Sequence, residues 1–144
     1  MNDLAWHVVG PHAMAATRDA LADACRAAAA DLAAWTSDAI ADGAALLVVN
    51  DPCRATRTRQ ALLALCHAQP ALRSLPLRVI VATGTHRFAD AERRQFEQAT
   101  LAGCGLRLDA VDWHDARDAT RLADVGGGGF HHWLGQGRAG LAVG

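Results

Sequence analysis

Two short, almost wholly apolar segments most constrain how this chain can fold. Residues 45–49 read ALLVV and Leu77–Ala82 reads LRVIVA, and neither alternates between apolar and polar side chains. Strands of this kind are typical of a parallel sheet, because helices cover both of its faces. A polar loop and then a helical pattern follow each segment. The sequence therefore predicts an α/β fold, a three-layer, Rossmann-like parallel sheet with helices on both faces.

The first two helices are predicted from apolar residues that recur every three or four positions. The Ala-rich residues 14–35 form the first helix. A second should be capped by Thr56 or Thr58 and stopped by Pro70. The inner stripe of this second helix is Leu62, Leu65, Cys66 and Gln69.

A third helix should begin at a cap formed by Asp90 and end at Gly103 and Gly105. Phe96 and Ala99 are expected to face the interior. The side chains expected on its outer face are Arg93, Arg94 and Glu97.

The last part of the chain predicts smaller elements. Residues 107–113 read as a third strand, residues 117–123 as a short helix, and the glycines at 126–129 as a loop. Gly140–Val143 predicts a fourth strand at an exposed edge of the sheet, through which the chain would self-associate. We expect the adjacent residues His131 and His132 to pack under this strand instead of binding a metal. Side chains at neighbouring positions of a helix point in different directions, so both are not expected to reach one ion.

Composition narrows the functional classes. The 144 residues fit one domain spanning 1–144, and a net charge of −1 with scattered arginines offers no face for nucleic acid. No apolar run is long enough to cross a membrane, and the first residues lack the pattern of a signal peptide. The cysteines form no CxxC pair, so we expect a cytoplasmic protein with reduced thiols, three of them buried. They are Cys25, Cys53, Cys66 and Cys104.

Polar side chains suited to catalysis follow three successive strands. In a parallel sheet these loops meet at the carboxyl ends of the strands, where ligands bind. An arginine donates two parallel hydrogen bonds to a carboxylate, and a histidine exchanges protons near neutral pH. The sequence therefore predicts a site for a small hydroxy acid at this edge. Its residues, loop by loop, are Asp51 and Arg54, His86 and Arg87, and His114 and Asp115.

Each of these residues also has an ordinary structural explanation. Asp51 would cap the next helix, Arg54 would be a solvated surface charge, and His86 would be a surface histidine. Pairs such as His114 and Asp115 are common at turns, so a direct role for this pair is the weaker expectation. Position alone does not decide between these interpretations.

Three motifs in these loops are informative together. VVNDPCR at 48–54 is followed by VATGTHR at 81–87 and then by WHD at 113–115. Their order and spacing resemble the N-terminal domain of the nickel-dependent lactate racemase family, which typically shows Asp-x-Thr-Arg, Ala-x-Gly-x-His-Arg and His-Asp turns. The resemblance runs from about residue 46 to the C-terminus, and the Ala-rich N-terminal helix is only compatible with it.

The resemblance implies a racemase or epimerase of 2-hydroxy acids. Arg54 matches the arginine that binds the substrate carboxylate, and Asp51 matches the acid that supports it. His86 matches one of two histidines that act as acid and base at the substrate hydroxyl. In full-length members the α-hydrogen moves as a hydride to a nickel pincer nucleotide and returns to either face. The residues assigned beside them are Arg87 at the substrate and, as accessories, His114 and Asp115.

The chain departs from the family pattern in two ways. Cys53 replaces the threonine that the family has before the arginine, and Pro52 precedes it. This difference in the turn favours a different substrate. The family's second histidine, its cofactor-bearing lysine and its nickel-binding histidine lie beyond the strand at which this chain stops, and the chain contains no lysine. We therefore expect no metal site, no cofactor bound by this chain alone and no racemisation by it. Whether it is an enzyme stays open.

The leading hypothesis is therefore the substrate-binding half of a 2-hydroxy-acid racemase or epimerase, separated from its C-terminal domain. One alternative is a non-catalytic α/β module that binds carboxylates, and another is a half-enzyme completed by a partner chain. The expected partner in each case includes a small 2-hydroxy carboxylate.

Overall fold

A parallel sheet organises the computed structural model, which describes residues 6–8, 23–24, 26–41, 45–124, 129–136 and 140–143. Within these ranges the sheet has five strands in the order β1-β7-β2-β3-β4, and every neighbouring pair is parallel. The strands are β1 (Trp6–Val8), β7 (Gly140–Val143), β2 (Ala45–Asn50), β3 (Leu77–Ala82) and β4 (Leu108–His114). The predicted α/β, Rossmann-like parallel sheet is confirmed.

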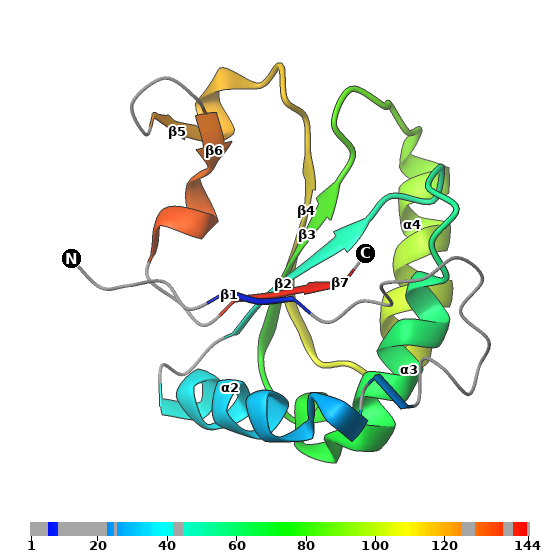
Figure 1. Ribbon diagram of the computed structural model, residues 1–144. Coiled ribbons are helices and arrows are strands. Elements are labelled where there is room, and N and C mark those ends of the chain that lie inside the picture. Colours follow the sequence, from blue (N-terminus) through cyan, green and yellow to red (C-terminus); the bar gives the residue numbers. More distant parts are fainter. Residues whose placement is uncertain are drawn as a thin grey trace.

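Among the described residues, three α-helices cover one face of this sheet: α2 (Ala29–Ala41), α3 (Thr58–Ala68) and α4 (Asp90–Phe96) (Figure 1). Inner residues of these helices, every second residue of β2 and β3, Trp113 of β4 and two residues of β7 form a single buried cluster. Its members include Trp35 of α2, Leu62 and Leu65 of α3, and Leu47, Val79 and Val81 of the sheet.

Smaller elements cover the opposite face. Ile80 and Asp112 are partners in register on this face, and Asp112 contacts His131 of a two-stranded hairpin. The hairpin pairs β5 (Leu122–Asp124) with β6 (Gly129–His131). Arg78 donates to the Gln136 amide at 3.3 Å, which places the 3-10 helix η5 (His132–Gln136) on the same face. The second outer layer is thus a hairpin with a 3-10 helix.

The first helix continues six residues past its predicted end at residue 35. The stripe formed by Leu32 and Trp35 extends to Ala39, so burial continues along the same face. Thr36 and Ser37 usually favour helix ends, but here their hydroxyls donate to carbonyls four residues earlier. Residues 14–22 of the predicted helix lie outside the described residues.

Predictions about the start of α3 were partly wrong. Arg57 occupies the cap position and makes no capping bond with its side chain, while the hydroxyls of Thr56 and Thr58 lie 3.2 Å apart and interact with each other. The predicted stripe is confirmed in Leu62, Leu65 and Cys66, which are buried, and Pro70 starts a short 3-10 turn after the helix (Pro70–Arg73).

The third helix differs from its prediction at its start, whereas Gly105 ends the helical segment as predicted, in the left-handed conformation. Ala89 is the cap residue and its amide donates to the Glu92 carboxylate at 2.7 Å, so Asp90 is the first helical residue instead of the cap. After Phe96 the chain makes a π-helical turn, Glu97–Leu101, and then a 3-10 turn, Ala102–Cys104. The wider turn rotates Ala99 away from the core, so Ala99 is exposed and not inward.

Two side chains predicted to face outward from α4 pack against Trp113 of β4. The Arg93 guanidinium lies 5.7 Å from the centre of the Trp113 ring, and its Nε donates to the Phe88 carbonyl. Glu97 accepts a 2.7 Å hydrogen bond from Trp113 Nε1. Phe96 also faces this ring, as predicted.

The C-terminal part of the chain was predicted least well. Residues 117–123 form only a 3-10 turn, Ala119–Arg121, and then enter β5. Gly129, expected in a loop, belongs to β6, while residues 125–128 lie outside the described residues. The final strand β7 is not at an edge, because β1 pairs along its other side. The predicted edge position of β7 is therefore wrong, and self-association of the chain stays a prediction without this basis.

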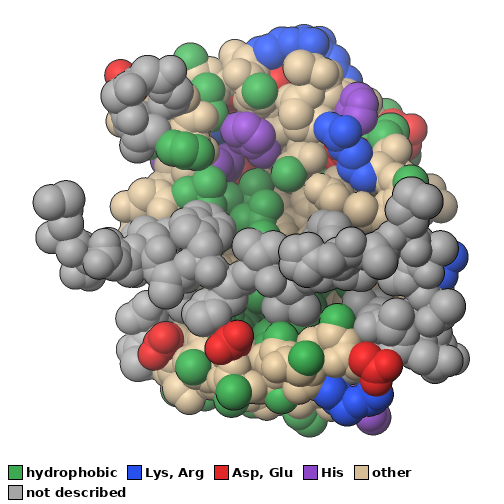
Figure 2. All heavy atoms as spheres, viewed as in Figure 1, with side chains coloured by type: hydrophobic (Ala, Val, Ile, Leu, Met, Phe, Trp, Pro, Cys, Tyr) green, Lys and Arg blue, Asp and Glu red, His purple; other side chains and the backbone are tan. Residues whose placement is uncertain are grey.

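Figure 2 shows histidine side chains gathered on the upper part of one face, above an apolar centre. Within the described residues, no helix combines the length and apolar character that crossing a membrane requires. Of the described cysteines, Cys66 and Cys104 are buried and Cys53 is exposed. Cys25 lies outside the described residues, so the expectation of three buried thiols stays a prediction.

Candidate functional site

A buried carboxylate lies at the carboxyl end of the central strand β2. Asp51 directly follows β2, and only 1% of its surface is exposed. One carboxylate oxygen, Oδ1, accepts a hydrogen bond from the Cys53 amide at 2.8 Å. The backbone carbonyl of Asp51 accepts a second one from the Arg54 amide at 3.2 Å. These bonds close a tight turn. Asp51 does not cap α3, which begins later at Thr58.

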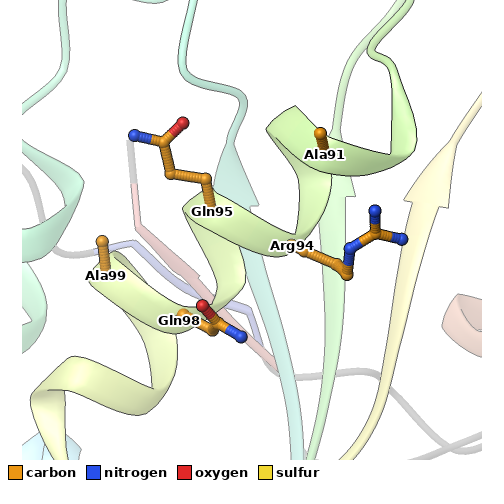
Figure 3. Close-up of a pocket in the computed structure, with 5 residues that line it drawn as sticks. All are labelled: Ala91, Arg94, Gln95, Gln98 and Ala99. Carbon is orange, nitrogen blue, oxygen red and sulfur yellow. The ribbon is translucent and has the colours of Figure 1, made fainter.

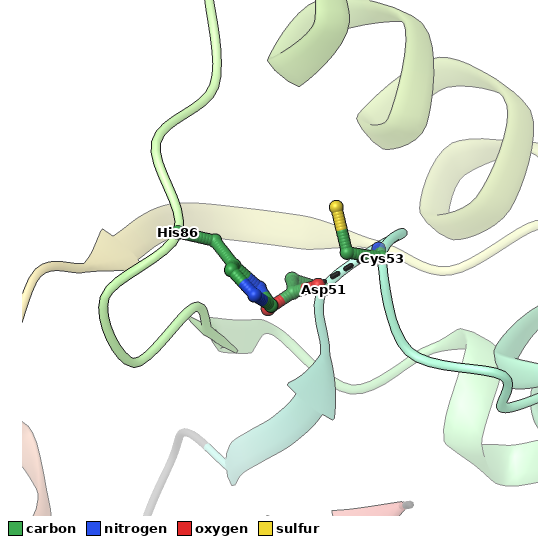
Figure 4. Close-up of side chains that lie close together, drawn as sticks. All are labelled: Asp51, Cys53 and His86. Carbon is green, nitrogen blue, oxygen red and sulfur yellow. Dashed lines mark hydrogen bonds and ion pairs between the residues drawn. The ribbon is translucent and has the colours of Figure 1, made fainter.

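The second carboxylate oxygen of Asp51 is shared with the next loop. His86, four residues after β3, approaches Asp51 Oδ2 with its Nδ1 at 3.0 Å (Figure 4). Because an ionised carboxylate only accepts, Nδ1 carries the proton and Nε2 is left as an acceptor. The His86 side chain is 41% exposed. Solvent and ligands can therefore reach the ring that carries Nε2.

Arg54 adds a positive charge to the same oxygen. Its Nε lies 3.9 Å from Asp51 Oδ2, which makes an ion pair without a close hydrogen bond. The side chain is 53% exposed, and a Cβ placed on Gly84 would lie 3.7 Å from its Nη2. The guanidinium therefore lies beside the glycine turn of the second loop, with donors free for a ligand.

Figure 4 shows a third group, the thiol of Cys53, beside the Asp51 carboxylate. One ligand atom from each of Asp51, Cys53 and His86 lies within 4.8 Å of the others. The three atoms are an oxygen, a sulfur and a nitrogen, a combination that suits a divalent transition metal. No metal site was predicted from the sequence, because Cys53 was seen only as a replacement for a threonine.

The remaining predicted residues do not join this group in the described structure. Arg87 is exposed on the His86 loop. The imidazole of His114 faces His131, with ring centres 5.7 Å apart, on the hairpin side of the sheet. Asp115 accepts a 2.9 Å bond from the Arg117 amide, which is the turn role weighed against a functional one.

The third loop nevertheless supports the second. The hydroxyl of Thr83 donates to the His114 carbonyl, and the Ala116 amide donates to the Gly84 carbonyl at 3.2 Å. These bonds link the segments that follow β3 and β4. They fix the backbone from which His86 projects.

A second polar cluster, which the sequence did not reveal, lies under the hairpin. Asp112 and His131 are both buried, and His131 Nε2 lies 2.9 Å from the Asp112 carboxylate. Arg121 pairs with the same carboxylate. Burial lowers the pKa of His131, although Asp112 acts in the opposite direction. The position of Asp112 between partly buried Val111 and buried Trp113 was the only signal for it, and that signal is weak.

A shallow hollow also lies on the outer side of α4 (Figure 3). It contains no acid, thiol or imidazole, so its chemistry is limited to hydrogen bonding and one positive charge. Its lining residues are Ala91, Arg94, Gln95, Gln98 and Ala99.

No family model, no curated protein and no solved structure is significantly similar to this chain. The resemblance to the lactate racemase family therefore rests on its three short motifs. The contacts of Asp51, Arg54 and His86 are therefore the main basis for a functional proposal.

Proposed function

We propose that this chain binds a small 2-hydroxy carboxylate at the carboxyl end of β2 and β3, as the substrate-binding part of a racemase or epimerase. In this proposal the Arg54 guanidinium binds the ligand carboxylate. His86 Nε2 accepts the proton of the ligand hydroxyl while Asp51 holds the ring. Asp51 and Arg54 come from the loop after β2 and His86 from the loop after β3.

One observation carries the proposal: Arg54 and His86 both contact Asp51 Oδ2, at 3.9 and 3.0 Å. In a 2-hydroxy acid the carboxylate and the hydroxyl are on adjacent carbons, so their protein partners have to be close neighbours. A shared carboxylate oxygen provides this closeness.

The relation to the lactate racemase family belongs to this proposal. The resemblance implies a nickel pincer nucleotide held through a lysine, and the chain has no lysine. The residues present therefore do not fit that attached cofactor, and no step here depends on it. In this proposal the chain binds the ligand carboxylate and moves the hydroxyl proton. There are two alternatives: a carboxylate-binding module without chemistry, and a half-enzyme completed by a partner chain.

Titration with lactate and with propionate tests the proposal. The two ligands share a carboxylate and differ in the hydroxyl. We expect Arg54→Ala to weaken the binding of both by about ten-fold or more, since it removes a charge-assisted contact. His86→Gln should reduce mainly the preference for lactate. NMR titration or calorimetry measures both effects.

Arg94→Ala is the matched control. Arg94 is an exposed arginine on α4, away from the Asp51 turn, so its loss should leave lactate affinity unchanged. Arg93 is unsuitable because it packs on Trp113. Equal weakening by Arg54→Ala and Arg94→Ala would mean that lactate responds only to net charge, and the proposal would fail.

A further inference from the structure

We propose that Asp51, Cys53 and His86 form a binding site for a zinc-type divalent cation. This inference goes beyond the proposed carboxylate site, although it uses two of the same side chains. It rests on three different donor atoms brought together by two loops: the carboxylate and thiol from the turn after β2, and the imidazole from the loop after β3.

The distances fit a tetrahedral ion with small adjustments. Zinc binds oxygen and nitrogen at about 2.0 Å and sulfur at about 2.3 Å, so neighbouring ligand atoms are roughly 3.3 to 3.6 Å apart. His86 Nδ1 and Asp51 Oδ2 are 3.0 Å apart, and all three ligand atoms lie within 4.8 Å of one another. Cys53 is exposed, so its side chain has room to rotate toward the other two.

The donor set selects the type of metal. Thiolate and imidazole favour zinc, cobalt or similar ions over magnesium and calcium, which prefer oxygen ligands. Three protein ligands leave a fourth position for water or for an oxygen of a bound molecule. A site of this composition is of the open kind, suited to holding a ligand.

The surroundings of the carboxylate prepare it for this role. The Cys53 amide donates to Asp51 Oδ1 at 2.8 Å, which fixes the carboxylate and leaves Oδ2 for the ion. Arg54 opposes the ion, because its positive charge lies 3.9 Å from Oδ2. Its half-exposed side chain can turn into solvent, at a cost to metal affinity.

Metal and proton compete for the same atoms. The ion replaces the proton on His86 Nδ1 and that on the Cys53 thiol, so binding releases protons and tightens as pH rises. With the metal on Nδ1, Nε2 carries the remaining proton. The metal-bound form therefore does not use His86 as a proton acceptor, which separates this site from the proposed function.

Cobalt and zinc titrations of the full chain test the site. Cobalt should bind at one equivalent and give the charge-transfer absorption of a thiolate ligand, and zinc should displace it. Cys53→Ser should lose that absorption. Both Cys53→Ser and His86→Gln should raise the zinc dissociation constant by at least about ten-fold. Cys53 is exposed, so its replacement should leave the fold intact. His67→Gln, an exposed histidine on α3, is the matched control and should bind like the wild type.

The outcomes are separable from those of the lactate experiment. Arg54→Ala should weaken lactate binding and strengthen zinc binding, because the opposing charge is gone. A wild-type chain that binds lactate but neither metal, or a Cys53→Ser chain with unchanged cobalt absorption, overturns the metal site. A chain that binds zinc through Cys53 but binds no lactate overturns the proposed function and leaves the metal site standing.

Discussion

The side chain of Asp51 is fully buried and has three polar partners. Its Oδ1 accepts from the Cys53 amide, and its Oδ2 contacts the His86 imidazole and the Arg54 guanidinium. A buried carboxylate without such partners would be strongly unfavourable, so these contacts are the condition for its burial. The geometry of both proposed sites depends on this one residue.

Gly84 turns the backbone of the loop after β3. Its φ of 61° lies in the left-handed region, where a side chain is strained. We expect Gly84→Ala to lower the free energy of unfolding by about 1–2 kcal/mol, measured by denaturant titration. The new Cβ would meet Arg54 only at 3.7 Å, so lactate affinity should change little in the folded variant.

Gly135→Ala provides the comparison for this prediction. A Cβ at Gly135 meets nothing within 4 Å, and its φ is not in the left-handed region. Its unfolding free energy should stay within about 0.5 kcal/mol of the wild type. A similar loss in both variants would show that the conformation of Gly84 is not what matters.

At the scale of elements, the β5–β6 hairpin and the turn before it cover a charged side chain of the sheet. Asp112 lies in the interior of β4, where His131 of β6 lies 2.9 Å from its carboxylate and Arg121, the last residue of the 3-10 turn before β5, pairs with it. The rings of His114 and His132 lie beside that of His131. The hairpin is therefore held on the sheet by polar contacts, where α2 and α3 are held by apolar ones.

The histidine of this cluster predicts a pH dependence of stability. The pKa of His131 is lowered from its ordinary value of 6.5, mainly because burial disfavours the charged ring. As pH falls below 6.5, the unfolded chain takes up a proton that the folded chain does not, so the free energy of unfolding falls. Above 6.5 the ring is neutral in both states and contributes no slope.

Denaturant titrations at several pH values check this sign. His131→Gln keeps a donor to Asp112 but does not titrate, so its unfolding free energy should fall less between pH 6.5 and lower pH than that of the wild type. The variant losing as much stability as the wild type over this range would contradict a neutral His131 in the folded chain. His67→Gln, on the surface, controls for general effects of losing a histidine.

At the scale of the whole molecule, the two ends of the described chain meet in the sheet. β7 lies between β1 and β2, with Leu141 paired to His7 on one side and to Leu47 on the other. The sheet is thus completed by segments that are far apart in sequence, and its described edges are β1 and β4. Pairing between segments so far apart in sequence carries a loop-closure cost, so it depends on the remaining fold.

Leu141 should therefore be important for global stability. Its side chain is fully buried, and Leu141→Ala should cost about 2–5 kcal/mol of unfolding free energy through lost burial and a cavity. Ile40→Ala removes a similar aliphatic side chain that is 61% exposed, and should change stability little. A loss below that of Ile40→Ala would contradict the central position of β7.

Much of the fold followed from local sequence patterns. The apolar runs at 45–49 and 77–82 predicted parallel strands because strands covered on both faces must be apolar throughout. Once the sheet was parallel, the loops bearing Asp51, Arg54 and His86 had to emerge at one edge. The grouping of these three residues was predictable for that reason.

Tertiary structure alone decided the rest. Cys53 joins His86 in one group because the loop after β3 brings the imidazole to the Asp51 carboxylate, a contact between residues 35 positions apart. Asp112 is buried because a hairpin closes over it, and β7 is central because a three-residue strand pairs outside it. Periodicity reports which face of an element is buried, but it does not report which distant segment buries it. That choice depends on long-range pairing and packing.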